Sequence, residues 1–293
     1  MTENALPIQE LIHARLADLT PAERRVARAI LADYPLLALR STSVIADEAN
    51  TSPATVVRFV AKLGFDGLPA FHDAVRNELD RATQSPFALY QPPSGDVSPS
   101  VAAAESVLSL VTAAMQRLSP TQVADAVDAL MAARRVWVAG GRFSQGIAHT
   151  LFAHLNLLRP EVRLLGPWPL PIADQIAHSG RDELAVVFDF RRYDPTAEFI
   201  ASHFARSRGQ AIVVTDPYLS PAAQYSAHTF VVPVEGHGLV DSYTGALAVV
   251  DVLIATMVAK DERRMAQRSA GLERARQAAD EITHNRRGYQ DHL

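Results

Sequence analysis

The order of apolar and polar residues divides the chain into two regions. Residues 1–83 have the pattern of a run of short helices. From Val101 onward, helical segments alternate with short runs rich in β-branched residues, which lie at 135–139, 162–165, 184–188, 211–215 and 229–233. Strands that alternate with helices predict βαβ units and a parallel sheet. We therefore expect an all-α N-terminal domain and a C-terminal α/β domain of three layers, with a mostly parallel five-stranded sheet.

The segment "QSPFALYQPPSGDVSPSV" separates these two regions. Its prolines, with serine and glycine between them, are typical of a linker. The sequence therefore predicts a helical domain at 1–83, a linker at 84–100, the α/β domain at 101–262 and a helical tail at 263–293. We expect the arginine-rich tail to be a solvated helix or one that packs in a dimer.

The stretch "LTPAERRVARAIL" carries the signals of a helix start. Thr20 is placed as the N-cap, Pro21 as the first helical residue and Glu23 as the third, which together form a capping box with a proline start. We expect this helix to begin at Pro21 and to end between Asp33 and Pro35. A second short helix is predicted at 44–49.

The next stretch, "ANTSPATVVRFVAKLGF", predicts a turn followed by a further helix. Asn50 tolerates a left-handed turn, Ser52 can cap, Pro53 can open the helix and Gly64 can close it. The order of helix, tight turn and helix is that of a helix-turn-helix, so we expect the domain at 1–83 to be one.

The face of this helix opposite its apolar stripe has the character of a recognition surface. Val56, Val60 and Leu63 share the stripe, with Val57 and Phe59 on its flanks. The residues expected to contact DNA are Ser52, Ala54, Thr55, Arg58 and Lys62. Small residues permit close approach to the groove, and the two cations can bind guanine or phosphate. The alternative is an ordinary solvated face, since residues 1–83 contain more acids than bases.

The same residues carry a family resemblance. "LTPAERRVARAILADYP", followed by "SVIADEANTSPATVVRFVAKLGFDGLPAFHDAV", resembles the N-terminal domain of the RpiR (MurR/RpiR) family of bacterial transcriptional regulators. In that family a helix-turn-helix domain precedes a SIS, or sugar isomerase, domain that binds phosphosugars and dimerises. The resemblance implies operator DNA and a small anionic metabolite as partners, and a homodimer or dimer of dimers.

A glycine-containing turn follows the first predicted strand, in "RRVWVAGGRFSQGIAHTLFAHLNLL". Glycines between a strand and a helix let backbone amides approach an anion at the helix N-terminus. They also serve steric needs in ordinary turns. The segment resembles the first SIS motif, which places Gly140, Gly141, Arg142 and Ser144 among the expected effector-binding residues.

The loop after the third strand, "VVFDFRRYDPT", departs from the SIS pattern. Where the family has two serines, a glycine and a threonine, this chain has Asp189, Arg191, Arg192 and Asp194. Three interpretations stay open: an arginine fork holds a phosphate or carboxylate, Asp189 and Asp194 pair with the arginines in a closed turn, or the arginines face a partner subunit. Asp189, Arg191 and Arg192 complete the expected effector-binding residues.

Composition excludes several classes of protein. The chain of 293 residues has no cysteine, so disulfides and thiolate metal sites are excluded, as fits a reducing cytoplasm. The net charge of −4 requires that any DNA-binding surface be local. The longest apolar run, 246–259, contains Asp251 and falls short of the roughly 20 residues that span a bilayer. We expect a core helix there, no secretory signal and a protein of the cytoplasm.

An enzymatic alternative rests on the SIS resemblance alone. SIS isomerases use a glutamate or histidine near the sugar, and the candidates here are His178, Glu235 and His237. No nucleophile with a paired base is evident, and His149 and His154 lack the i, i+4 spacing of a helical metal pair. We expect a regulator rather than an enzyme, with no cofactor and no metal.

Overall fold

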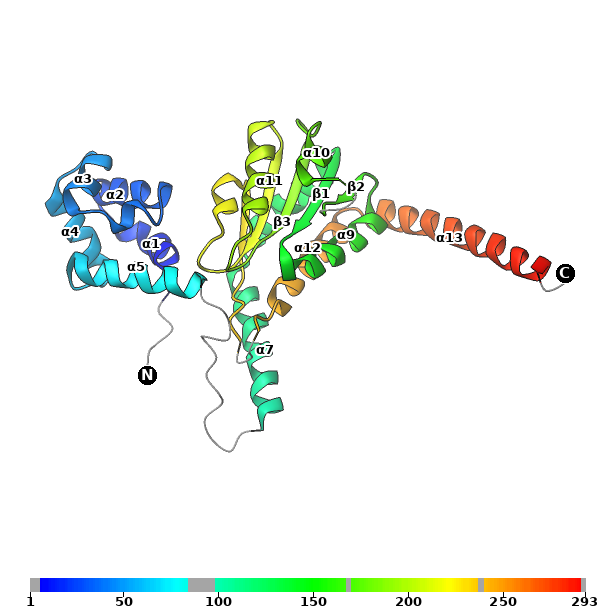
Figure 1. The fold of residues 1–293 in the computed structure, drawn as a ribbon, viewed down its shortest axis with the longest axis horizontal. Helices are drawn as coiled ribbons and strands as arrows, with labels where there is room; N and C mark the ends of the chain where they lie inside the picture. The colour runs from blue at the N-terminus through cyan, green and yellow to red at the C-terminus, as the bar shows by residue number, and fades with distance from the viewer. Residues whose placement is uncertain (1–5, 84–97, 167–169, 237–239, 291–293) are drawn as a thin grey trace.

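The computed structural model describes residues 6–83, 98–166, 170–236 and 240–290. The N-terminal region is helical (Figure 1). Its α-helices are α1 (Ile8–Arg15), α2 (Pro21–Ala32), α3 (Thr42–Glu48), α4 (Pro53–Lys62) and α5 (Gly67–Thr83), with short 3-10 turns η1 (Leu16–Asp18) and η2 (Leu37–Leu39). These helices enclose one apolar cluster, in which Ile12, Ile30, Phe59 and Phe71 are fully buried.

The start of α2 confirms the predicted capping box. The Thr20 amide donates to Glu23 Oε2 at 2.8 Å, and the Glu23 amide donates to Thr20 Oγ1 at 3.4 Å. Pro21 is the first helical residue and Asp33 the C-cap, as expected. The capping contacts lie within a few residues of one another, which is why the local sequence was enough to predict them.

Helices α3 and α4 form the predicted helix-turn-helix. Asn50 adopts a left-handed φ of 52° in the turn, and Gly64 adopts a φ of 96° after α4. Helix α3 begins two residues before the expected start, because Ser41 accepts from the Val44 amide and caps it. Of the two residues expected on the flanks of the stripe, Phe59 is fully buried and Val57 is 47% exposed.

The C-terminal region is a three-layer α/β domain. Its strands are β1 (Arg135–Gly140), β2 (Val162–Leu164), β3 (Glu183–Phe188), β4 (Gln210–Thr215) and β5 (His228–Val231). They form one sheet in the order β2-β1-β3-β4-β5, and every pairing is parallel. The five expected strands are therefore confirmed.

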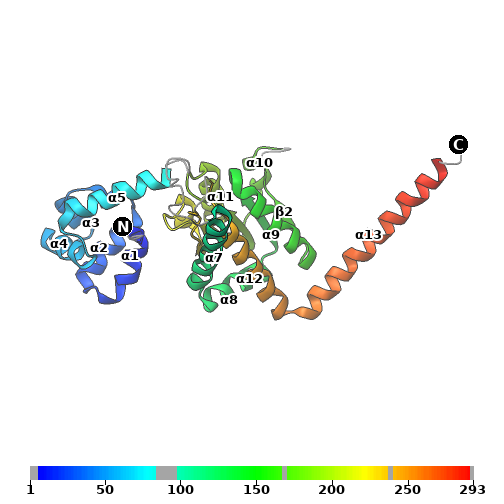
Figure 2. The same ribbon diagram turned by 90° about the horizontal axis from the view of Figure 1, so that it is seen from below.

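Helices cover both faces of this sheet (Figures 1 and 2). They are α7 (Pro99–Arg117), α8 (Pro120–Ala132), α9 (Gln145–Leu158), α10 (Ile172–Ile176), α11 (Pro195–Arg206) and α12 (Thr244–Lys260), with short turns η3 (Arg142–Ser144) and η4 (Pro221–Tyr225). Alternate residues of the strands face the two layers: Val186 packs with α8, α9 and α12, and Val187 packs with α10 and α11. Strand β3 is buried along its whole length, as a central parallel strand should be.

The last helix, α13 (Glu262–Gln290), leaves the body of the domain (Figure 1). Its first turns pack against α9, and Met265 is buried there. The predicted tail at 263–293 is thus helical over its described part. Among the described residues, no helix is long and apolar enough to cross a membrane.

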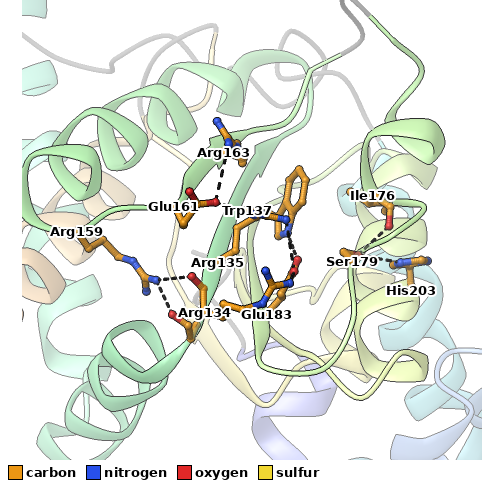
Figure 3. A network of polar contacts seen from close by, with 11 residues as sticks. Arg134, Arg135, Trp137, Arg159, Glu161, Arg163, Ile176, Ser179, Glu183 and His203 are labelled. Atoms are coloured by element: carbon orange, nitrogen blue, oxygen red, sulfur yellow. Dashed lines mark hydrogen bonds and ion pairs between the residues drawn. The ribbon is translucent and has the colours of Figure 1, made fainter.

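A buried carboxylate ties the amino ends of the strands together (Figure 3). The side chain of Glu183 has no exposed surface, and its carboxylate accepts from Trp137 Nε1 at 2.7 Å and from Arg134. Arg135 Nη1 lies 3.5 Å from Glu183 Oε1, the oxygen that accepts from Arg134. Nearby, Arg159 donates to the carbonyl oxygens of Leu130 and Ala133 at the end of α8. The polar side chains at this end of the sheet are therefore bonded to one another and to backbone carbonyls.

Replacing Glu183 by Ala should destabilise the C-terminal domain by about 3 kcal/mol, because the Trp137 indole and two arginines lose a buried partner. Glu183→Gln, which keeps an acceptor for Trp137, should cost less. The measurement is urea unfolding followed by tryptophan fluorescence, since both tryptophans lie after residue 100. As a control, Glu161→Gln alters a half-exposed carboxylate at the same end of the sheet and should change stability much less than Glu183→Ala does. Equal effects of the Ala and Gln variants would contradict the assignment.

Candidate functional site

The exposed face of α4 is organised around Arg58. Arg58 Nη2 donates to Thr55 Oγ1 at 3.1 Å, and Thr55 is only 4% exposed. The Ser52 hydroxyl caps the helix by accepting from the Thr55 amide at 3.3 Å. Of the expected DNA contacts, Ser52, Ala54, Arg58 and Lys62 are exposed and Thr55 is not. Thr55 is therefore too buried to contact DNA directly, and its hydroxyl positions the Arg58 guanidinium.

Lys62 has a structural partner as well as an exposed position. Its ammonium donates to Glu23 Oε2 at 2.8 Å and to the Asp18 carbonyl at 3.1 Å. Burial alone would raise the pKa of Glu23, but the hydrogen bonds from Lys62 and Thr20 outweigh it and lower this pKa to about 2. Lys62 thus holds α4 against α2. Among the residues the structure describes, Arg58 makes no ion pair, so its charge stays available.

A second candidate site lies where β1 and β3 end. Parallel strands present their carboxyl ends at one edge of the sheet, where loops and helix N-termini converge. The cavity encloses about 20 Å³, which is space for roughly one water molecule. Its lining residues are Gly141, Arg142, Phe143, Ser144, Asp189, Phe190, Arg191, Arg192, Asp194 and Tyr243. The structure thereby brings together all the expected effector-binding residues except Gly140, which is the residue before Gly141.

The loop after β1 needs its first glycine for steric reasons. A Cβ on Gly140 would lie 2.5 Å from the Ser144 carbonyl oxygen, so no larger residue fits. The Ser144 hydroxyl lies 2.7 Å from the Gly141 oxygen and 2.8 Å from the Phe188 oxygen, and the residue is 4% exposed. Because both carbonyl oxygens can only accept, the single hydroxyl proton of Ser144 is donated to one of them or shared between them, and the contact with Phe188 ties the loop to β3. Its hydroxyl is thus used within the fold.

The rim of the cavity is formed by two exposed residues. Phe143 is 66% exposed, and the Arg142 guanidinium lies 5.9 Å from the centre of its ring. Arg142 has a φ of 27°, in the left-handed region that favours glycine. The rim therefore combines a cation with an aromatic face.

Asp189 forms the buried floor of the cavity. It is 3% exposed, and its carboxylate accepts from the Asp194 amide at 3.1 Å and from the Ser220 hydroxyl. Burial raises the pKa of Asp189 more than these hydrogen bonds lower it, to about 6. Asp194 in turn caps α11, because its Oδ1 accepts from the Thr196 amide at 2.9 Å.

A second buried carboxylate, Asp216, stands beside it at the end of β4. It has no exposed surface, and it accepts from the Tyr193 hydroxyl at 2.8 Å, the Tyr218 amide at 2.9 Å and the Arg191 amide. Burial raises its pKa to about 7. Asp216 was not among the expected site residues, although an aspartate directly after a buried strand was a usable signal.

Arg191 pairs with carboxylates other than Asp189 and Asp194. Its guanidinium forms a bidentate pair with Asp241, with Nε to Oδ2 at 2.9 Å, and Nη1 reaches Glu235 Oε1 at 3.2 Å. The interpretation that Asp189 and Asp194 pair with the arginines is therefore wrong within the described residues. Arg191 does form ion pairs, but its partners Glu235 and Asp241 lie 44 and 50 residues further along the chain. The Arg191 side chain is 3% exposed and fully engaged.

Arg192 differs from its neighbour. It has a left-handed φ of 63° and is partly buried, and its Nε is buried with no hydrogen-bond partner in the described structure. Of the isomerase candidates, Glu235 is paired with Arg191, His178 is exposed and His237 lies outside the described residues. The described residues contain no cluster of side chains suited to a metal ion.

The raised pKa of Asp189 gives a pH-dependent prediction. A buried acid with a raised pKa binds more protons in the folded state, so its contribution lowers stability as pH rises from about 4 to about 6, by up to about 3 kcal/mol. Asp189→Asn keeps an acceptor for the Asp194 amide but removes the charge. Its melting temperature should fall less than that of the wild type between about pH 4.5 and about pH 7.

The control for this measurement is Asp125→Asn, at an exposed position of α8. It should reproduce the pH dependence of the wild type. If the melting temperature of Asp189→Asn depends on pH as that of the wild type and of Asp125→Asn does, the pKa of Asp189 is not raised in the folded protein.

Comparisons with known proteins identify both domains. Residues 7–82 match the helix-turn-helix domain of the rpiR family, and residues 129–256 match the SIS domain. The chain is 25% identical over 229 residues to the HTH-type transcriptional regulator HexR of Pseudomonas aeruginosa, an alignment that covers 76% of this chain and 78% of that protein.

Two solved structures share the fold. The sugar isomerase domain of an RpiR transcription factor from Sphaerobacter thermophilus aligns with a TM-score of 0.57 and 23% identity, over 60% of this chain and 98% of that one. Vibrio vulnificus NanR, solved in complex with ManNAc-6P, aligns with a TM-score of 0.52 and 17% identity, over 91% of this chain and 97% of that one. The chain therefore carries an N-terminal helix-turn-helix domain of the rpiR family followed by a C-terminal SIS domain.

Proposed function

We propose that this protein binds operator DNA through α4 and that a small anionic metabolite, bound where β1 and β3 end, changes its affinity for that DNA. The observation that carries the proposal is the exposed face of α4. It presents Arg58, fixed by a hydrogen bond from Nη2 to the buried Thr55 hydroxyl at 3.1 Å, on the second helix of a helix-turn-helix. No acidic residue lies between Ser52 and Leu63 to oppose it.

The proposed DNA contact assigns separate roles to the residues of this face. Ser52 and Ala54 are small and exposed at the start of α4, where a recognition helix approaches base edges. Arg58 can form a bidentate contact to guanine or phosphate. Lys62 can reach a phosphate only in competition with Glu23, so its main role is to hold α4 against α2.

The effector half of the proposal rests on the strand-end cavity. Arginines, a glycine turn and a helix N-terminus converge there, and each of these features suits an anion. The related fold of NanR was solved with a phosphorylated amino sugar, which supports a phosphosugar or a similar anion as the ligand class. The enclosed space is small, so a ligand must displace the exposed side chains of Arg142 and Phe143 at the rim.

We further propose that two or four copies of the chain act together and that the chain is no isomerase. A dimer would place two α4 helices in successive major grooves of a near-palindromic operator. The effector would act by binding more tightly to one placement of these helices than to the other. Against isomerase activity stands the engagement of Glu235 by Arg191 and by the Tyr218 hydroxyl, at 3.2 and 2.8 Å.

Arg58→Ala should weaken operator binding by at least about tenfold and reduce the dependence of affinity on salt by about one ion. The measurement is fluorescence anisotropy of a labelled operator, taken from the DNA flanking the gene, over a series of salt concentrations. Arg76→Ala is the matched control, since Arg76 is an exposed arginine of α5 that is 59% accessible and pairs with its helical neighbour Asp73. If Arg58→Ala binds as tightly as Arg76→Ala at every salt concentration, α4 is not the recognition helix.

A further inference from the structure

Three arginines line the strand-end cavity, and their environments differ. Arg191 is satisfied by Asp241 and Glu235. Arg142 is exposed at the rim and stacks on Phe143. Arg192 alone is both partly buried and incompletely paired, since its Nε is buried without an acceptor in the described structure. A buried donor without a partner is unfavourable, and because it belongs to a residue that lines the cavity, we infer that an acceptor is supplied from outside the chain.

The backbone at Arg192 supports this inference independently. Its φ of 63° is one that residues with side chains rarely adopt, and glycine would be the favourable choice there. An arginine kept in a strained conformation beside a cavity is more consistent with a ligand contact than with a role in folding. The neighbouring residue, Arg191, is fixed by the bond from its amide to Asp216. The two arginines therefore have different roles although they are adjacent.

The cavity is also lined by a hydrogen-bond acceptor, Asp194. Asp194 Oδ1 caps α11, whereas Asp194 Oδ2 accepts no hydrogen bond from the described residues. Oδ2 is directed toward the loop after β1, because a Cβ built on Gly141 would lie 3.4 Å from it. A free carboxylate oxygen can accept from a hydroxyl group but repels a bare anion.

We propose that Arg192 binds the anionic group of the effector and that Asp194 Oδ2 accepts from a hydroxyl group of the same molecule. The ligand class is then a polyhydroxylated anion, with a phosphate or a carboxylate as its charged group. This inference rests on the proposed function, in which the C-terminal domain binds a small anionic metabolite. It assigns the specificity of the site to Arg192 and Asp194 and gives Arg191 a structural role.

The test measures binding of a defined set of probes to the full chain by calorimetry and thermal shift. The probes are glucose 6-phosphate, fructose 6-phosphate, N-acetylmannosamine 6-phosphate, gluconate and inorganic phosphate. The sugar phosphates and the sugar acid distinguish the two possible anionic groups, and inorganic phosphate lacks the hydroxylated carbon chain. We expect at least one hydroxylated probe to bind more tightly than inorganic phosphate.

The decisive variant is Arg192→Gly, because it removes the side chain and suits the left-handed backbone. It should lower the affinity for the hydroxylated probe by at least about tenfold while leaving the melting temperature of the ligand-free protein unchanged or higher. Asp194→Asn keeps the cap at Oδ1 and should weaken binding of the hydroxylated probe but not of inorganic phosphate. Arg142→Ala is the control at the exposed rim and should have a smaller effect than Arg192→Gly.

The possible outcomes separate this inference from the function on which it rests. Binding that survives Arg192→Gly within about twofold overturns the inference and leaves the proposed function standing. A lower melting temperature of ligand-free Arg192→Gly would also overturn it, since it would show that Arg192 serves the fold. If the wild type binds none of the probes, both this inference and the effector half of the proposed function fail, while operator binding stays a separate result.

Discussion

The arrangement of the strand-end site depends on two buried carboxylates, Asp189 and Asp216, at the ends of β3 and β4. They accept from the Ser220 hydroxyl and from the backbone amides of Asp194 and Arg191. In a site that cradles a phosphate with hydroxyls and amides, donors of these kinds would face the ligand. Here these three donors are used within the protein, so the arginines that line the cavity gain importance for binding an anion. Asp216 fixes the Arg191 backbone through its amide, while Asp241 and Glu235 hold the Arg191 side chain. Arg192, the next residue, lines the cavity.

Features determined by neighbouring residues were predictable from the sequence. The capping box at Thr20 and Glu23, the turn at Asn50 and the start of α4 at Pro53 each involve contacts a few residues apart. The five strands were predictable because runs of β-branched residues between helices have few alternatives in a parallel sheet. The burial of α12 followed from its length and its apolar composition.

Contacts between distant segments could not be predicted in this way. The partners of Arg191 are 44 and 50 residues away, and the partner of Lys62 is 39 residues away. A sequence shows that charges are present but not which of them meet. Thr55 lies on the side of α4 expected to face outward, yet its hydroxyl is buried beneath Arg58. The different roles of the two adjacent arginines likewise became visible only with their surroundings.

The central claim is that this chain recognises a specific DNA sequence through paired copies of α4. It is tested most directly by selection of duplexes from a random-sequence pool with the purified full-length protein. The account predicts enrichment of a near-palindromic sequence whose half-sites lie about one helical turn, or a multiple of it, apart. Retention of DNA without any enriched sequence, to an extent that depends on salt alone, would contradict it.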